Sequence, residues 1–260
     1  MIVFTISNNK GGVGKTAITI NLGAALARQK KRVLLIDWDS QSNLTGCLLN
    51  NVNHSITLSD LFEPSDNPVL AKDCIYLCPH QARLWVMANS IESSGLDLSL
   101  HETLADCIYG LRDKIAEHIK EFDFVLIDTP PSVGRFTAQA LALSDAVIIP
   151  VDSSQYDSLE GINRVLELID AVLHFNPNLK SQKFVINKVH GKELICKEVV
   201  NDLTIRFPAE DILKTQISRT TAMAQANRFR QTIYAYDHTR PVAREFTALA
   251  REIIGIYCNG

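Results

Sequence analysis

A glycine-rich turn near the start of the chain constrains the fold more than any other feature of the sequence. The segment Lys10–Thr16 reads KGGVGKT, and it lies between the apolar run Ile2–Ser7 and a helical pattern over Lys15–Gln29. Glycines let consecutive backbone N–H groups turn toward one centre, and a helix that begins there directs the positive end of its dipole to the same point. The sequence therefore predicts a strand, a phosphate-binding turn and a helix, in that order.

The residues of this turn have separate expected roles. Lys15 can reach the β- and γ-phosphates of a nucleotide, and the hydroxyl of Thr16 can ligate Mg²⁺. Lys10 precedes the glycines, so its side chain projects away from its own phosphate cradle. This geometry suggests a two-fold dimer in which each Lys10 reaches the phosphates bound by the other subunit. The other nucleotide-binding residues of the turn are expected to be Gly11, Gly12, Val13, Gly14 and Ala17.

Short apolar runs alternate with helical patterns along the rest of the chain. The strands are expected at Val33–Asp37, Cys74–Cys78, Phe124–Asp128, Ala146–Val151 and Phe184–Asn187, and the helices near 102–120, 135–143, 158–173 and 242–257. Fully apolar strands that alternate with helices indicate an α/β fold, in which a mostly parallel twisted sheet has helices on both faces. No linker divides the chain, so residues 1–260 are expected to form a single domain.

Several segments resemble the ParA/MinD superfamily of P-loop ATPases, in matching order and over nearly the whole chain. Lys10–Thr16 is similar to its deviant Walker A motif, and Val33–Thr45 (VLLIDWDSQSNLT) to a strand followed by switch I. Phe124–Ser132 is similar to its Walker B strand and switch II, and Ala146–Gly161 to the matching segment of the ParA partition proteins. Ile212–Arg219 lies where that family has a strand and an Ile-Pro-Arg turn. The sequence is thus identified as similar to the ParA/Soj-type partition ATPases.

The resemblance implies an ATPase that binds ATP or ADP with Mg²⁺, and it implies roles for three acidic residues. Asp39 occupies the position of the family's catalytic aspartate, and it is expected to orient or deprotonate the attacking water. Asp128 is expected to hold Mg²⁺ through water, and Asp37 to support switch I and the water shell of the metal. The implied catalytic set is Lys10, Lys15 and Asp39, and the implied metal set is Thr16, Asp37 and Asp128.

Two residues beyond the turn complete the expected nucleotide site. Asn187 follows a strand and resembles the residue that hydrogen-bonds adenine, although an ordinary turn asparagine is the alternative. Ser218 replaces the proline of the family's Ile-Pro-Arg turn and is expected to lie at the nucleotide.

Charge is unevenly divided between the two parts of the chain. Residues 1–179 contain 13 Lys and Arg against 21 Asp and Glu, whereas residues 180–260 contain 13 against 8. The resemblance implies an ATP-dependent homodimer that binds nonspecific DNA, and a ParB-like activator protein that stimulates hydrolysis. The expected DNA-binding residues are Lys214, Arg219, Arg228, Arg230, Arg240 and Arg244, with ordinary solvated surface charges as the alternative.

The sequence also allows functions other than DNA partition. A MinD-like membrane helix would need a strongly basic polar face, whereas the last helix mixes acidic and basic residues there, so its apolar stripe is expected to pack in the core. That stripe consists of Phe246, Leu249, Ala250, Ile253, Ile254 and Tyr257. No membrane partner and a cytoplasmic, nucleoid-associated location are expected. A MinD-like or protein-organelle positioning ATPase and a nucleotide-binding regulatory module with negligible turnover remain the alternatives.

Overall fold

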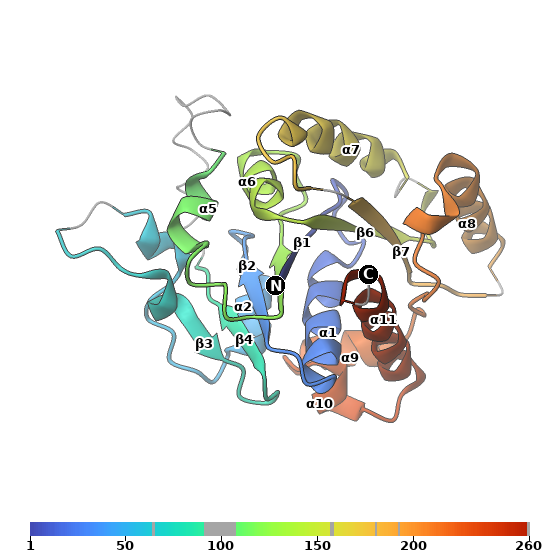
Figure 1. The fold of residues 1–260 in the computed structure, drawn as a ribbon. Coiled ribbons are helices and arrows are strands. Elements are labelled where there is room, and N and C mark those ends of the chain that lie inside the picture. The colour runs from blue at the N-terminus through green and yellow to red at the C-terminus, as the bar shows by residue number, and fades with distance from the viewer. Residues whose placement is uncertain (64–65, 91–107, 157–158, 180, 192, 259–260) are drawn as a thin grey trace.

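One sheet contains every strand of the residues that the computed structural model describes, which are 1–63, 66–90, 108–156, 159–179, 181–191 and 193–258. The strands are β1 (Ile2–Ile6), β2 (Val33–Asp37), β3 (Ile75–Leu77), β4 (Leu84–Met87), β5 (Phe124–Asp128), β6 (Ala146–Asp152) and β7 (Ser181–Asn187). Their spatial order is β3-β4-β2-β5-β1-β6-β7, and only the β3–β4 pair is antiparallel (Figure 1). The predicted α/β fold with a mostly parallel sheet is confirmed.

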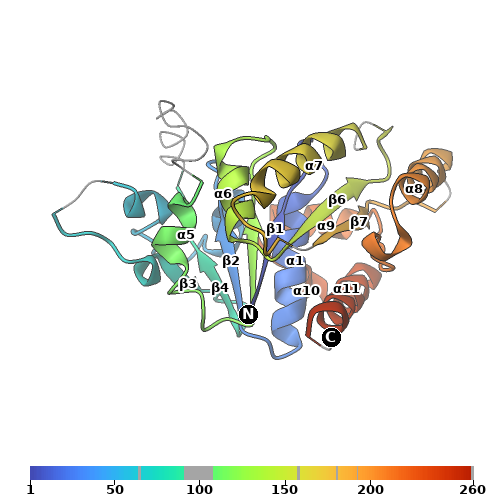
Figure 2. The same ribbon diagram turned by 45° about the horizontal axis from the view of Figure 1, so that its top comes forward.

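Helices cover both faces of this sheet. They are α1 (Lys15–Arg28), α2 (Asn43–Leu48), α5 (Gly110–Ile115), α6 (Arg135–Leu143), α7 (Glu160–Leu173), α8 (Leu194–Arg206), α9 (Thr221–Arg228), α10 (Ile233–Asp237) and α11 (Pro241–Cys258). The described residues also form the short 3₁₀ helices η1 (Leu58–Leu61), η2 (Ala71–Cys74) and η5 (Ala209–Asp211). Helices α1 and α11 lie on one face, whereas α6 and α7 lie on the other (Figure 2).

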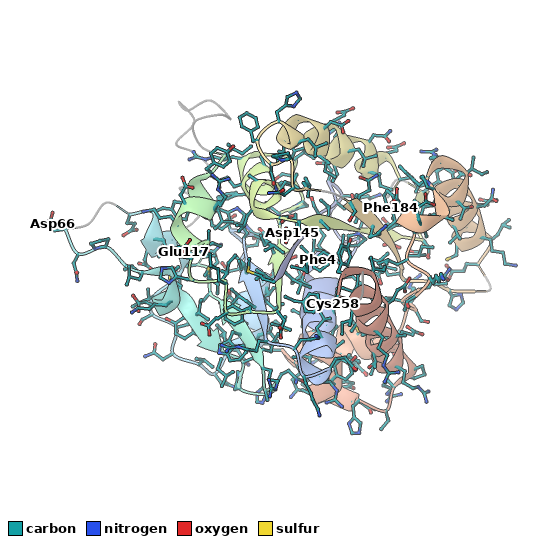
Figure 3. The ribbon with its side chains drawn as sticks, in the orientation of Figure 1. Phe4, Asp66, Glu117, Asp145, Phe184 and Cys258 are labelled. Carbon is teal, nitrogen blue, oxygen red and sulfur yellow. The ribbon has the colours of Figure 1, made fainter. Side chains whose placement is uncertain are left out.

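Alternate side chains of the strands pack into separate cores on the two faces. Phe4 stacks on Phe124 with ring centroids 6.3 Å apart and meets the ring of Tyr257 edge-on at 4.9 Å, so it packs toward α11. Phe184 lies in β7 and packs on the opposite face, where its ring centroid is 4.3 Å from that of Phe207 (Figure 3). Because both faces are buried, the strands can be apolar throughout, and this is why they were visible in the sequence.

The register of the central strands brings their carboxyl ends together. Asp37 of β2 lies beside Asp128 of β5, and Asp128 lies beside Ile6 at the end of β1. The chain therefore leaves three neighbouring strands at one edge of the sheet, which is where ligands bind in open parallel sheets.

Most predicted elements are confirmed, with differences at the edges. Of the helix predicted over 102–120, the described residues 108–120 contain α5, and residues 102–107 lie outside the described residues. Residue 158, the first of the helix predicted over 158–173, also lies outside them. The strand expected within Ile212–Arg219 is wrong, because this segment makes only two isolated bridges, at Ile212 and Ser218. The N–H groups of Leu213 and Ile217 still donate to carbonyls of β7. Between and after them, side chains of α11 accept the N–H groups, Glu252 from Lys214 and Thr215 and Glu245 from Ser218.

Helix α11 packs as the sequence predicts. Its apolar stripe contributes Phe246, Leu249, Ala250 and Ile253 to the core, and Ile254 and Tyr257 pack against that core. Among the helices of the described residues, we find none that combines the length and the apolar composition needed to cross a bilayer.

Candidate nucleotide-binding and catalytic site

The glycine-rich turn joins β1 to α1 at the carboxyl edge of the sheet. Gly14 precedes α1 with φ of 98°, and Gly12 has φ of 79°, so both lie in the left-handed region that glycine adopts without strain. A Cβ atom on Gly14 would also lie 2.4 Å from Nδ2 of Asn187, whereas one on Gly12 would meet nothing within 4 Å. The shape of the turn therefore depends on glycine at both positions, and at Gly14 for a second reason.

Hydrogen bonds hold this turn against the neighbouring strands. Nδ2 of Asn8 donates to the carbonyl of Pro150 in β6 (2.9 Å), and Oδ1 of Asn8 accepts from the N–H of Lys10 (3.0 Å). On the other side, the hydroxyl of Thr129 donates to the carbonyl of Ile6 (2.9 Å). The turn is thus anchored to β5 and β6 before any ligand contacts it.

The side chain of Lys15 lies inside the turn and is only 7% exposed. Its Nζ donates to the carbonyls of Asn8 (3.0 Å) and Lys10 (3.2 Å). Burial lowers the pKa of Lys15, and the nearby carboxylates of Asp128 and Asp39 oppose that shift. A buried ammonium group held only by carbonyl oxygens is well placed to gain an anionic partner.

The three predicted acidic residues converge next to this lysine. Asp37 and Asp128 are completely buried, and Asp39 is 7% exposed. Burial, and then repulsion from Asp37, raise the pKa of Asp128 to about 8, while a hydrogen bond from the Thr16 side chain and the charge of Lys15 act in the opposite direction. Burial also raises the pKa of Asp37 to about 6. Carboxylates that repel each other in a dry site are favourable partners for a cation.

Two oxygens of this cluster are suited to a hard metal ion. Oδ1 of Asp37 and Oδ2 of Asp128 are buried and have no hydrogen-bond partner among the described residues. Mg²⁺ prefers oxygen ligands, keeps several waters and usually takes one or two carboxylates from the protein. The residues present, Asp37, Asp128 and the hydroxyl of Thr16, therefore fit a magnesium ion.

A polar network that the sequence analysis missed positions the switch I segment. Both the N–H and the hydroxyl of Thr45 donate to Oδ2 of Asp37, at 2.8 and 2.7 Å. Asn89, just beyond β4, donates its N–H to the Thr45 hydroxyl (3.0 Å) and its Nδ2 to the carbonyl of Asp39 (3.2 Å). The N–H of Gln41 donates to Oδ1 of Asp39 (3.0 Å). A polar residue directly after an apolar strand is the signal that could have revealed Asn89.

A cavity of about 680 Å³ opens beside the turn. Such a volume suits a nucleotide-sized ligand. Of the residues predicted to bind the nucleotide, the cavity is lined by Gly11, Gly12, Gly14, Lys15, Thr16, Ala17, Asn187 and Ser218. Asp39 also lines it, next to the phosphate turn. Val13 is buried behind the turn, and its carbonyl accepts from Nδ2 of Asn187 (2.8 Å).

The far wall of the cavity comes from the C-terminal part of the chain. Ser218 is fixed by Glu245 of α11, which accepts from its N–H (2.8 Å) and its hydroxyl (2.6 Å). A proline at position 218 would have no N–H to offer, so this clamp depends on the serine. Helix α9 adds Met223, Ala224 and Asn227, which sequence analysis did not identify as site residues.

The six basic residues predicted to bind DNA are all exposed, and they surround α9–α11. Two of them are already paired with carboxylates: Arg240 with Asp237 at 2.8 Å, and Arg219 with Glu193 at 4.0 Å. The surface therefore has basic residues in the predicted region, but the charges of Arg219 and Arg240 are partly neutralised by neighbouring carboxylates.

Comparison with known proteins agrees with the sequence motifs and the geometry. A family model described as an AAA domain matches residues 1–181. The chromosome-partitioning ATPase Soj of Thermus thermophilus is 33% identical over 250 residues, which cover 96% of this chain and 94% of Soj.

Two solved structures have the same fold. Cobyrinic acid a,c-diamide synthase from Mycobacterium smegmatis, solved with bound ADP and magnesium, is 26% identical with a TM-score of 0.74, over 88% of this chain and 91% of that one. A putative plasmid partition protein from Borrelia burgdorferi bound to AMPPNP is 19% identical with a TM-score of 0.81, over 98% of this chain and 99% of that one. Taken with the near-full-length similarity to Soj and the phosphate turn beside three converging aspartates, these findings show that the chain belongs to the ParA/Soj family of ATPases.

Proposed function

We propose that this ATPase dimerises when it binds ATP and Mg²⁺, that the dimer binds DNA without sequence preference, and that a ParB-like protein stimulates hydrolysis and release. The cycle would partition a plasmid or a chromosome, or position another cargo, in the cytoplasm on the nucleoid. The observation that carries this proposal is that the phosphate turn, Lys15 and Asp39 line one cavity of nucleotide size, and that Asp128 and Asp37 are buried close to them.

The glycine-rich turn binds the phosphate groups of the nucleotide. Its backbone N–H groups and the N-terminus of α1 stabilise negative charge. Lys15 exchanges its two carbonyl partners, Asn8 and Lys10, for phosphate oxygens, because a charge-assisted hydrogen bond is stronger than a neutral one. The base would contact Asn187 and Ser218, which also line the cavity.

The acidic residues have separate roles in metal binding and in hydrolysis. Thr16, Asp37 and Asp128 would hold Mg²⁺, which would supply positive charge to stabilise the phosphate groups during hydrolysis. Asp39 orients the attacking water and takes its proton, and the backbone contacts of Gln41 and Asn89 fix this part of switch I.

Dimerisation completes the site. Lys10 places its charge on the phosphates bound by the opposite subunit, so each active centre receives one cation from its partner. Residues 129–132, which follow β5, carry the state of the γ-phosphate to the dimer surface. Hydrolysis then weakens the dimer and DNA binding together, since two linked DNA-binding surfaces bind far better than one.

The test is the Asp39→Ala variant, with Asp66→Ala as a matched control. Asp66 is exposed and lies at the tip of the segment between η1 and η2, remote from the cavity (Figure 3). With ATP and Mg²⁺, Asp39→Ala should form a stable dimer that remains on DNA, while its hydrolysis rate falls by about 100-fold or more. The control should behave like the unchanged protein.

The result also separates the proposal from the regulatory-module alternative. A module with negligible turnover would show the same dimer lifetime and DNA binding in both variants. Light scattering, a DNA mobility shift and phosphate release measure the three properties. An Asp39→Ala protein that stays monomeric with ATP and Mg²⁺ would refute the proposal.

A further inference from the structure

Two consecutive residues at the end of β7 bind carbonyl groups of the phosphate turn. Asn187 is the last residue of β7, and its Nδ2 donates to the carbonyl of Val13 (2.8 Å). Lys188 follows it, and its Nζ donates to the carbonyl of Gly12 (2.6 Å). Both side chains also line the nucleotide cavity. The turn is therefore held by β7 as well as by β5 and β6.

Lys188 has a second partner, which is buried. Its Nζ donates to Oδ2 of Asp152 (2.7 Å), and the Asp152 side chain is 1% exposed, whereas that of Lys188 is 34% exposed. Asp152 ends β6 and lies beside Asn187 in the register of these neighbouring strands (Figure 1). Oδ1 of Asp152 accepts from the N–H (3.0 Å) and the hydroxyl (2.6 Å) of Ser154. This fixed carboxylate anchors a chain of contacts that we call the Asp152–Lys188–Gly12 bridge.

The backbone of Lys188 has an unusual conformation. Its φ is 56°, in the left-handed region that a residue with a Cβ atom seldom adopts. Such a conformation persists only where the surrounding structure fixes it, and it is common beside ligand sites. The next residue, Val189, is fixed in turn, because its N–H donates to the carbonyl of Ile217 (2.9 Å). The chain thus bears a local cost at the position from which Lys188 reaches Gly12.

The orientation of two peptide units follows from these contacts. A peptide unit is planar and trans, so its C=O and N–H groups point in opposite directions. The carbonyl of Gly12 shares its unit with the N–H of Val13, and the carbonyl of Val13 shares its unit with the N–H of Gly14. Lys188 and Asn187 hold the two carbonyls, so the two N–H groups are directed the opposite way. Successive N–H groups directed to one side of a turn form an anion-binding site.

We propose that Lys188 is a positioning residue for phosphate binding: anchored by Asp152, it holds the peptide unit between Gly12 and Val13 so that the Val13 N–H can donate to a phosphate oxygen. The inference deepens the proposed function and rests on its nucleotide site. Lys188 acts through the backbone of the turn, whereas Lys15 would contact the phosphates itself. Sequence analysis identified Lys15 and did not identify Lys188 or Asp152 as residues of the site.

The same strand offers a matched control. Lys183 of β7 also joins a carbonyl to a carboxylate, since its Nζ donates to the carbonyl of Glu210 (2.7 Å) and lies 3.4 Å from Oδ1 of Asp211. It precedes Asn187 by four residues, which is about 13 Å along a strand. Lys188→Met and Lys183→Met therefore each remove one such bridge, but only the first bridge includes the turn.

The experiment measures affinity and stability separately on the full-length protein. Calorimetry gives the affinity for ADP and for a non-hydrolysable ATP analogue, each with Mg²⁺, and thermal melting without nucleotide gives the stability. Lys188→Met should bind both nucleotides about tenfold or more weakly, because a misdirected N–H loses a hydrogen bond to a charged group. Lys183→Met should keep the affinity of the unchanged protein.

A double variant separates positioning from a purely structural role. Lys188→Met leaves the buried Asp152 without its cation, so its melting temperature should fall. Adding Asp152→Asn removes the uncompensated charge and should restore much of that stability. The nucleotide affinity should nevertheless stay low, because nothing holds the Gly12 carbonyl. A purely structural role would restore the affinity together with the stability.

The single variant Asp152→Asn gives a result whose sign matters. If Lys188 acts through its anchor, losing Asp152 should weaken nucleotide binding, by less than Lys188→Met does. If Lys188 instead contacted the phosphates directly, its release from Asp152 would strengthen binding, and the inference would be wrong.

The possible failures can be told apart. If the unchanged protein binds neither nucleotide with Mg²⁺, the proposed function fails. If it binds them, but Lys188→Met and Lys183→Met lose equal affinity or none, the inference about Lys188 is wrong while the proposed function stands. Recovery of affinity in the double variant would overturn the inference in the same way.

Discussion

Replacing Gly14 by alanine tests whether the phosphate turn is held in the shape described. At φ of 98° an alanine is strained by about 1–2 kcal/mol, and its Cβ would lie 2.4 Å from Nδ2 of Asn187. Asn187 is buried, and it would have to give up its 2.8 Å hydrogen bond to the carbonyl of Val13, which costs about 1–3 kcal/mol. Gly14→Ala should therefore lower the free energy of unfolding by about 2–5 kcal/mol.

Gly12→Ala is the matched control for this change. Gly12 has φ of 79°, but a Cβ there meets nothing within 4 Å, so only the strain of about 1–2 kcal/mol applies. The effect of alanine on the unfolded chain is common to both variants and cancels in the comparison. Denaturant melts without nucleotide or metal measure the difference. Adding Asn187→Ala to Gly14→Ala should remove the clash, so the two changes should not be additive. Equal destabilisation by the two glycine variants would refute the reasoning.

Three further outcomes are expected. Lys10→Ala should prevent ATP-dependent dimerisation, measured by light scattering, while the monomer retains nucleotide binding. Burial and a neighbouring carboxylate raise the pKa of Asp128 from 3.8 to about 8, so the metal-free folded protein holds a proton that the unfolded chain has released. Its free energy of unfolding should therefore fall as pH rises from about 4 to about 8, and Asp128→Asn should flatten that dependence in melts at several pH values. Glu245→Ala and Glu252→Ala each remove two hydrogen bonds to the 214–218 segment and should cost similar stability, but only Glu245→Ala should weaken nucleotide binding in calorimetry, because its partner Ser218 lines the cavity.

Elements with a clear apolar pattern were predictable, and elements without one were not. Strands such as Val33–Asp37 are apolar up to a terminal carboxylate, so their composition identified them. Helix α8 was missed because its buried positions Cys196, Val199 and Leu203 compete with the exposed apolar residues Leu194 and Ile205, which blur the helical period. Strand β4 was missed because it lies in the least regular part of the sequence.

The residues of the site also differ in whether the sequence reveals them. The phosphate turn is local in sequence, so its residues and their roles could be predicted from spacing. The support of Asp37 by Thr45 and Asn89 could not, because it joins three segments that meet only in the folded sheet.

The convergence of Asp37, Asp39 and Asp128 has a consequence for the lifetime of the protein in the cell. Mutual repulsion in a buried place raises the free energy of the folded chain, and a bound cation and nucleotide relieve it. A ligand present at about 100 times its dissociation constant adds about 2.7 kcal/mol to the stability of the fold that binds it. We therefore expect starvation, which depletes ATP, to increase the fraction of molecules that proteases can degrade, so that energy supply would control abundance as well as activity.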